Sequence, residues 1–157
     1  MDQHSPSPVN TAPDLNTVLA DVLANLAFMV SDDEPAAPPP QTVWLEGEIH
    51  YQGPQRGRLQ CWCTQPFAVQ LAANLLGTEP DDRQAQQAGH DAVREFMNVL
   101  CGQFVTARYG TRPVFSLTIP TVHNCGGPPD LNDASPHDAC RLSVGGEPFL
   151  CRHCVEP

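Results

Sequence analysis

Apolar and polar positions in the first third of the chain repeat first with a helical period and then with a strand period. From Leu15 to Leu26 apolar residues recur every three or four positions, which predicts an amphipathic helix ending near Val30. Residues 43–51 and 59–63 then alternate between apolar and polar side chains, as half-buried strands do. A Gly-Pro pair between these two segments predicts a turn, so we expect them to pair as a hairpin.

Helix stops, turn residues and a second hairpin predict the rest of the fold. Thr64 and Pro66 open an apolar helical stripe that ends at Gly77, and a longer helical segment follows the Glu-Pro-Asp-Asp stretch and ends at about Tyr109. The remaining predicted elements are a strand at 115–119, a loop at 123–138 and a hairpin of strands at 139–144 and 147–153. This order predicts an α/β chain of the α+β type, in which helices pack on a mainly antiparallel sheet.

Length and composition favour one folded unit with a short tail. A chain of 157 residues has the size of one domain, and 41% hydrophobic residues are enough for a core. Residues 1–13 are polar and interrupted by proline, so we expect a disordered tail there. Residues 14–157 then form a single domain, which contains a proline-rich spacer at 31–41 and the loop at 123–138.

The net charge of the chain limits the kinds of molecule that it is expected to bind. Eighteen acidic residues against eight arginines and no lysine give a formal net charge of −10. Without a basic cluster, the chain has no electrostatic footprint for nucleic acid or for an anionic membrane. The N-terminus lacks the features of a secretory signal, and no apolar run is long enough to span a bilayer. We therefore expect a cytoplasmic protein whose seven cysteines, an odd number, are free thiols.

Cysteine and histidine near the C-terminus raise the question of a metal site. Cys140, Cys151, His153 and Cys154 are residues of the types that bind zinc. Three of the four fall within four consecutive positions, and the adjacent His153 and Cys154 would project from opposite faces of a strand. We expect no metal ligands and spare thiols on a terminal strand, with structural zinc as the alternative.

The helical segment 91–106 separates its side chains into two faces. At about 100° per residue its apolar residues gather on one side, which we expect to be buried. Four residues line up on the other side: the carboxylates of Asp91 and Glu95, the carboxamide of Asn98, and Gly102. Asparagine is a modest helix former, and glycine costs roughly 1 kcal/mol relative to alanine. The row is either a solvated face with an incidental glycine, where another helix crosses closely, or a functional surface.

The pattern Asp91-x-x-x-Glu95-x-x-Asn98-x-x-x-Gly102 resembles the signature helix of the CheC/CheX/FliY family of chemotaxis phosphatases. The stretch 115–122, which ends in Pro-Thr-Val, and the helix that ends at Gly77 are similar to flanking elements of that family, in the same order. CheC-type members generally carry two Glu-x-x-Asn helices and CheX-type members carry one. With a single such helix, the chain is similar to CheX.

The resemblance implies a CheC/CheX-like fold and a phosphatase, a hydrolase that acts on the phospho-aspartate of a CheY-like response regulator in two-component signalling. Asn98 would hold a water in line with the phosphorus, and Glu95 would pair with the lysine of the receiver. Asp91, Arg94 and Gly102 would contact the docked receiver, although Arg94 is better explained as a solvated helix charge. Mg²⁺ would come with the receiver, so the resemblance implies no cofactor of the chain's own.

Two further expectations follow from the resemblance. The alternative to an enzyme is a non-catalytic CheX-like adaptor that binds a receiver without hydrolysis. Some members of the family form dimers by joining their sheets, so a homodimer is a second kind of assembly to expect. The presence of both Glu95 and Asn98 favours the phosphatase over the adaptor.

Overall fold

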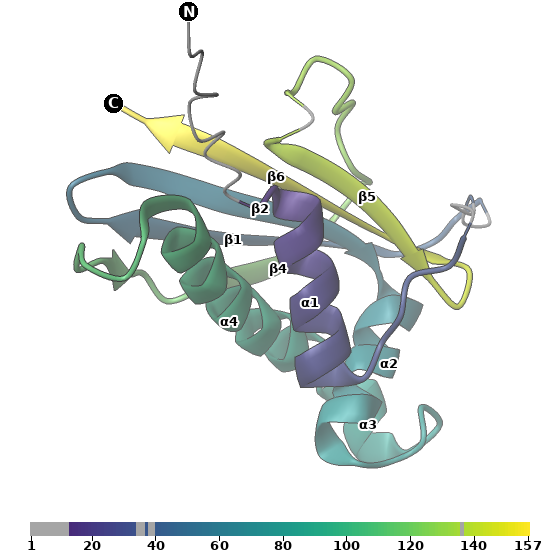
Figure 1. Cartoon of the computed structure of the whole chain (residues 1–157). Helices are drawn as coiled ribbons and strands as arrows, with labels where there is room; N and C mark the ends of the chain where they lie inside the picture. Colours follow the sequence, from purple (N-terminus) through teal and green to yellow (C-terminus); the bar gives the residue numbers. More distant parts are fainter. Residues whose placement is uncertain (1–12, 34–36, 38–39, 136) are drawn as a thin grey trace, which may run out of the picture.

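The structure is a computed structural model that describes residues 13–33, 37, 40–135 and 137–157 (Figure 1). Its helices are α1 (Leu15–Ala27), α2 (Gln65–Leu76), α3 (Arg83–Gln87) and α4 (Gly89–Tyr109). Its strands are β1 (Trp44–Gln52), β2 (Arg56–Thr64), β3 (Ser116–Leu117), β4 (Thr121–Cys125), β5 (Ala139–Val144) and β6 (Glu147–Glu156). Helices pack on an antiparallel sheet, which confirms the predicted fold class. Residues 1–12 of the tail predicted at 1–13, and residues 34–36, 38 and 39 of the spacer predicted at 31–41, lie outside the described residues.

The sheet is built around the predicted first hairpin. Its strand order is β3-β1-β2-β6-β5, and β4 pairs with the same edge of β1 that β3 uses. Every described pairing is antiparallel. The register turns Leu45, Ile49 and Tyr51 of β1 and Leu59, Cys61 and Cys63 of β2 to one face, where α1 and α4 lie side by side across the sheet (Figure 1).

Local signals set the ends of the first two helices. The Asp14 carboxylate accepts the backbone N–H of Thr17 at 2.9 Å and caps α1. At the other end Phe28 adopts a left-handed conformation with φ 55°, so the helix ends at Ala27 rather than near Val30 as predicted. In α2, the Thr64 hydroxyl accepts the N–H of Phe67 at 3.2 Å, and Gly77 closes the helix at φ 70°, as predicted.

The long helical segment predicted to end at Tyr109 is two helices. Ala88 leaves the helical region with φ −101° and ψ 9°, which separates α3 from α4. Gly89 begins α4 beside α2, where an added Cβ would come within 3.3 Å of the Ala68 Cβ. The break therefore falls where the start of α4 packs closely against α2.

The strand predicted at 115–119 is shorter than expected, and the loop predicted from 123 begins later. In the first segment β3 is followed by one more bond to β1, from the Thr118 N–H to the His50 carbonyl at 2.9 Å; beyond it Ile119 is 87% exposed and Pro120 has no N–H to donate. The chain resumes as β4, which pairs with β1 up to Cys125. The sequence did not indicate β4 because Val122 is its only buried residue.

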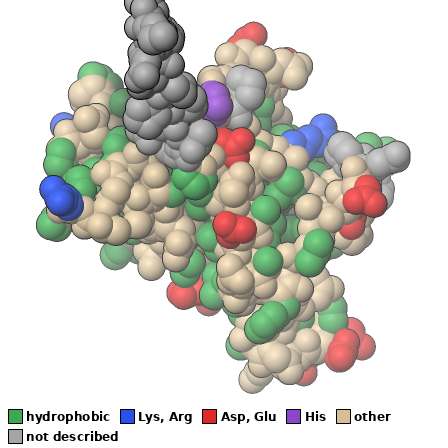
Figure 2. Space-filling model, in the orientation of Figure 1, with side chains coloured by type: hydrophobic (Ala, Val, Ile, Leu, Met, Phe, Trp, Pro, Cys, Tyr) green, Lys and Arg blue, Asp and Glu red, His purple; other side chains and the backbone are tan. Residues whose placement is uncertain are grey.

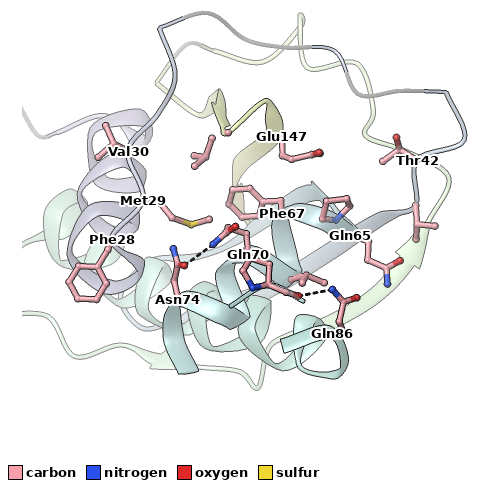
Figure 3. A pocket seen from close by; sticks show the side chains of 16 residues that line it. Phe28, Met29, Val30, Thr42, Gln65, Phe67, Gln70, Asn74, Gln86 and Glu147 are labelled. Atoms are coloured by element: carbon pink, nitrogen blue, oxygen red, sulfur yellow. Dashed lines mark hydrogen bonds between the residues drawn. The ribbon is translucent and has the colours of Figure 1, made fainter. Parts of the chain in front are cut away.

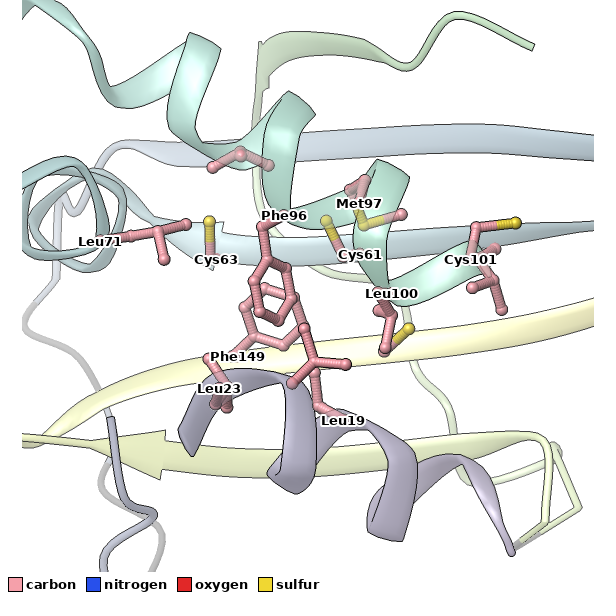
Figure 4. Packing of buried hydrophobic residues seen from close by; sticks show 14 of the residues in the cluster. Leu19, Leu23, Cys61, Cys63, Leu71, Phe96, Met97, Leu100, Cys101 and Phe149 are labelled. Atoms are coloured by element: carbon pink, nitrogen blue, oxygen red, sulfur yellow. The ribbon is translucent and has the colours of Figure 1, made fainter. Parts of the chain in front are cut away.

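The core lies between the sheet and the helices. The predicted apolar stripe of α4 is at most 1% exposed: Val93, Phe96, Met97, Leu100 and Phe104. Phe96 meets Phe149 of β6 edge to face at 5.4 Å between ring centroids, with Leu19 and Leu23 of α1 beside them (Figure 4). The rotation of α4 about its axis is thus fixed by packing on two sides.

A chain of polar side chains holds the C-terminal end of α4 to the sheet. The Tyr51 hydroxyl lies 2.7 Å from the hydroxyl of Tyr109 and 2.8 Å from His153 Nε2. On its other side, His153 Nδ1 lies 2.9 Å from Asp138 Oδ1. A neutral imidazole that donates from Nδ1 to the carboxylate and accepts at Nε2 from the Tyr51 hydroxyl satisfies every group. Burial lowers the pKa of His153, and the Asp138 carboxylate only partly opposes this.

The lowered pKa of His153 predicts a loss of stability in mild acid. In the unfolded chain this histidine titrates near pH 6.5, whereas the folded chain takes up the same proton only at lower pH. We expect the free energy of unfolding to fall as the pH drops below about 6.5. Above that pH, His153 is neutral in both states and should not affect the free energy of unfolding. Urea unfolding between pH 7.5 and 5 should show this fall, and His153→Gln should flatten it. His137→Gln, at an exposed position, should retain it; equal slopes for the native chain and His153→Gln would contradict the assignment.

Candidate functional site

The predicted polar row occupies the outward side of α4. Asp91, Glu95 and Asn98 are exposed, and Gly102 is half-buried. Within the described part of the chain, Glu95 and Asn98 make no hydrogen bond or ion pair with another side chain. Helix geometry places Asn98 about 4.5 Å along the axis from Glu95, and Gly102 about 6 Å further. A carboxylate and a carboxamide are therefore both available to a molecule that approaches this helix.

Asp91 and Arg94 form a pair at the N-terminal end of the row. Arg94 Nη1 lies 2.7 Å from Asp91 Oδ1, one turn apart on the helix. Asp91 also lies in the first turn, where a negative charge is favourable. An exposed pair of this kind contributes at most about 1 kcal/mol to stability. The structure thus brings together two of the predicted docking residues, and their charges offset each other.

The environment of Gly102 excludes one explanation of the glycine. A Cβ added there would meet nothing within 4 Å, so no helix crosses at this point. Other glycines are required by packing: a Cβ at Gly47 would lie 2.8 Å from Cys61 Sγ, and one at Gly57 would collide with the Tyr51 hydroxyl. The fold does not need a glycine at position 102, although the residue lowers the stability of the helix.

A hollow of about 290 Å³ opens beside Gly102 at the C-terminal end of the row. The segment after α4 turns back at Gly110 and passes alongside the helix before it enters β3. The lining residues are Gly102, Val105, Thr106, Gly110, Thr111, Pro113, Phe115 and Leu117, none of them charged. No pattern in the sequence indicates this hollow, because its second wall depends on how residues 110–117 fold back.

A larger pocket, of about 790 Å³, lies away from this row, between the ends of α1 and α2 and the turn that joins β5 to β6 (Figure 3). No residue of α4 lines it. Among the described residues its one charged lining residue is Glu147, whose Oε2 accepts a hydrogen bond of 2.6 Å from the Thr64 hydroxyl. Asn74 is held by Gln70 and by the Ala27 carbonyl, each at 2.8 Å. These polar groups are explained by their roles in capping and joining helices.

The cysteines do not form a reactive or metal-binding centre among the described residues. Burial raises the pKa of Cys61 and of Cys101 to about 12, which keeps both thiols protonated near neutral pH. His153, one of the candidate zinc ligands, uses both ring nitrogens for Tyr51 and Asp138. Over residues whose placement is described, no three His, Cys, Asp or Glu side chains converge as metal ligands.

The surface charge agrees with the composition. On the face that Figure 2 shows, acidic side chains are scattered over the helices and the few basic ones lie toward the edges. No helix in the described part of the chain has the length and apolar content to cross a bilayer.

Comparison with known proteins defines the class to which this fold and helix belong. The family described as chemotaxis phosphatase CheX matches residues 46–133, which is more than half of the chain and includes all of α4. The chain belongs to the CheX family. No curated protein sequence matches the chain.

Solved structures show the same fold at low sequence identity. CheX from Desulfovibrio desulfuricans has a TM-score of 0.64 and 19% identity, over 90% of this chain and 96% of that one. A CheX–CheY–BeF₃–Mg²⁺ complex from Borrelia burgdorferi has a TM-score of 0.62 and 16% identity, over 91% and 96%. A CheC-like protein from Shewanella sp. PV-4 has a TM-score of 0.64 and 17% identity, over 96% and 100%.

The open space at Gly102 predicts that alanine there stabilises the fold. Gly102→Ala should raise the free energy of unfolding by up to about 1 kcal/mol, because the helix gains a better former without a clash. Gly47→Ala is the matched control and should destabilise, since its Cβ would press on Cys61 Sγ. Urea unfolding of the native chain and both variants at one pH measures these changes in the free energy of unfolding. A destabilised Gly102→Ala would show that the fold itself requires this glycine.

Proposed function

We propose that the chain is a phosphatase that hydrolyses the phospho-aspartate of a CheY-like receiver in the cytoplasm. The observation that carries the proposal is the Glu95–Asn98 pair, which faces outward from α4 and is not engaged by the rest of the described chain. Membership of the CheX family supports it. So does the Borrelia burgdorferi relative, a CheX whose structure includes CheY, BeF₃ and Mg²⁺.

Asn98 has the chemistry needed to position a water. Its carboxamide donates from nitrogen and accepts at oxygen, so it can hold a water in one orientation, but it does not titrate and cannot act as a base. The water oxygen forms a bond to phosphorus as the bond from phosphorus to the aspartyl oxygen breaks, which leaves a free aspartate and inorganic phosphate. Phosphoryl transfer passes through a loose transition state, in which little bonding to phosphorus remains. Positioning of the water therefore supplies much of the catalysis. Mg²⁺ would belong to the phosphorylated receiver.

The rest of the row would orient the receiver. Glu95, a turn before Asn98, offers a carboxylate to a receiver lysine, and no described cation of the chain competes for it. Asp91 and Arg94 would contact the receiver as an ion pair without net charge, because Arg94 Nη1 already lies 2.7 Å from Asp91 Oδ1. Gly102 would let the receiver backbone approach, since nothing lies within 4 Å of its missing side chain. The predicted homodimer stays a prediction.

Removing the carboxamide of Asn98 should remove most of the catalysis and leave binding. CheY-like receivers from the same genome are phosphorylated with a small phosphodonor and Mg²⁺, and phosphate loss is followed with the native chain and with Asn98→Ala. We expect the native chain to accelerate the loss for its cognate receiver, and the variant to lose about 10²-fold of that acceleration, the size of a positioning defect of 1 Å. Gln103→Ala, which removes another exposed amide of α4, should act as the native chain does.

Each other outcome has a distinct meaning. Native protein that binds the receiver loaded with BeF₃ and Mg²⁺, but leaves phosphate loss unchanged, would identify the non-catalytic adaptor. Acceleration by Asn98→Ala equal to that of the native chain would show that the amide does not position the water.

Neutralising Glu95 should weaken docking more than turnover. Glu95→Gln keeps the shape of the side chain and removes its charge, so an ion pair with a receiver lysine becomes a weaker hydrogen bond. We expect about a tenfold higher half-saturating receiver concentration, equivalent to about 1.4 kcal/mol, with the maximal rate nearly unchanged. Added salt should weaken binding by the native chain more than by the variant. A lower maximal rate with unchanged half-saturation would instead place Glu95 in the chemical step.

A further inference from the structure

We propose that the pocket of about 790 Å³ binds a small organic cation, whose apolar body lies against the end of α1 and against α2 and whose ammonium group meets Glu147. The chemical class is an alkyl or aryl amine in its charged form. No residue of α4 lines this pocket, so the inference does not depend on the proposed function.

Three lining residues hold apolar side chains in solvent. Phe28, Val30 and Val43 are 80%, 77% and 43% exposed, whereas Met29 and Phe67 of the same lining are at most 3% exposed. Figure 3 shows Phe28, Met29 and Val30 on one side of the space, with Phe67 near its centre. An apolar body placed here would cover the three exposed side chains, and their removal from water would favour binding.

Phe28 adopts a backbone conformation that an aromatic residue rarely takes. It ends α1 in the left-handed region, with φ 55° and ψ 35°, where glycine or asparagine is usual. The Met29 N–H donates to the Leu23 carbonyl at 3.0 Å, so the fold uses the backbone turn at this point. The exposed ring of Phe28 gains little from packing in return for the strained backbone. A local rule broken without a gain in the fold tends to mark a functional position.

The charge at the pocket selects a cation. Glu147 is half-buried, and its hydrogen bond from the neutral Thr64 hydroxyl does not offset its charge. Among the described residues, no arginine or histidine forms an ion pair with it. An ammonium group beside Glu147 would gain a charge-assisted hydrogen bond, which is stronger than one between neutral groups.

The surroundings disfavour an anion. The chain has no lysine, and no arginine is among the described lining residues. The nearest basic residues in sequence are Arg83, which is exposed, and Arg141, which lines a different hollow together with residues 128–134. Asp32 adds negative charge at the β5–β6 turn, where its carboxylate accepts the N–H groups of Gly145 and Gly146 at 3.1 and 2.8 Å. A carboxylate or phosphate ligand would meet like charge here without a cation to offset it.

The shape of the pocket favours a small molecule over a folded partner. Its described walls come from five separate segments of the chain, within residues 28–30, 42–43, 65–74, 80–86 and 144–147. Segments on several sides enclose a ligand, whereas a groove that accepts a partner's helix is open along its length. A volume of about 790 Å³ also lies within the roughly 300–1,000 Å³ of sites that bind small organic molecules.

Two probes of equal chain length and opposite charge test the selectivity. Titration calorimetry at pH 7 compares decylammonium with decanoate, both below the concentrations at which they form micelles. We expect the native chain to bind one equivalent of decylammonium, with a Kd at least tenfold lower than that for decanoate. Glu147→Gln keeps an oxygen that can accept the Thr64 hydroxyl and should remove this preference. Glu95→Gln removes the same charge from α4, outside the lining, and should retain the preference.

A second pair of variants tests the apolar wall. Phe28→Asn removes the ring but suits the left-handed backbone, because asparagine adopts this conformation more readily than phenylalanine. We expect it to raise the Kd for decylammonium about fivefold, while Val114→Asn, at an exposed apolar position outside the lining, leaves the Kd unchanged. In urea unfolding Phe28→Asn should be at least as stable as the native chain.

Four results would overturn the inference. The first is a native chain that does not bind decylammonium saturably. The second is binding of several equivalents, equal in the native chain and Glu147→Gln, which would reflect only attraction to a chain of net charge −10. The third is a destabilised Phe28→Asn, because the ring would then serve the fold. The fourth is a concentration-dependent dimer in analytical ultracentrifugation that Phe28→Asn weakens and decylammonium leaves unchanged, which would assign the exposed apolar residues to a second copy.

Discussion

The rotation of α4 about its own axis is the constraint on which the candidate site depends. Phe96 packs edge to face on Phe149, and the rest of the apolar stripe is enclosed between α1 and the sheet. Turning the helix by one residue, about 100°, would expose these side chains and drive the Glu95 carboxylate toward the core, at a cost of several kcal/mol. The energy that buries Phe96 thus also holds Glu95 and Asn98 outward. No interaction of the two polar side chains themselves is needed to aim them.

The helical and strand periods are local, and that is why they could be predicted from the sequence. The buried stripe of α4, the hairpin of β1 with β2 and the hairpin of β5 with β6 all follow from spacing along a few neighbouring residues. Elements that depend on distant partners were missed or misplaced. β4 carries a single buried apolar residue, Val122, and exists because an edge of β1 is available to it. The break at Ala88 likewise depends on the approach of α2 to Gly89.

The same distinction applies to the site. Spacing alone put Asp91, Glu95, Asn98 and Gly102 on one face, but it could not decide whether Gly102 serves a helix crossing. The structure answers this question, because a Cβ added at Gly102 would meet no atom within 4 Å. Nor could spacing show that Val105, on the side of Asn98, is buried and lines one hollow together with residues from 110–117. The hollow is a tertiary feature, and the Tyr51–Tyr109 contact with Phe115 that shapes it joins segments more than fifty residues apart.

The row on α4 is where the chain departs from what stability alone would select. Gly57 and Gly47 are explained by collisions that a side chain would cause, and Glu147 by its hydrogen bond to the Thr64 cap. Glu95, Asn98 and Gly102 have no comparable role within the described fold, and two of them are weaker helix formers than alanine. Local rules broken without a gain in the fold itself tend to mark functional positions. Here the three positions lie along one outward side of α4, which ends beside an uncharged hollow lined by polar and apolar groups. This agrees with the docking role that we propose for the row, in which the Glu95 carboxylate and the Asn98 amide meet a partner.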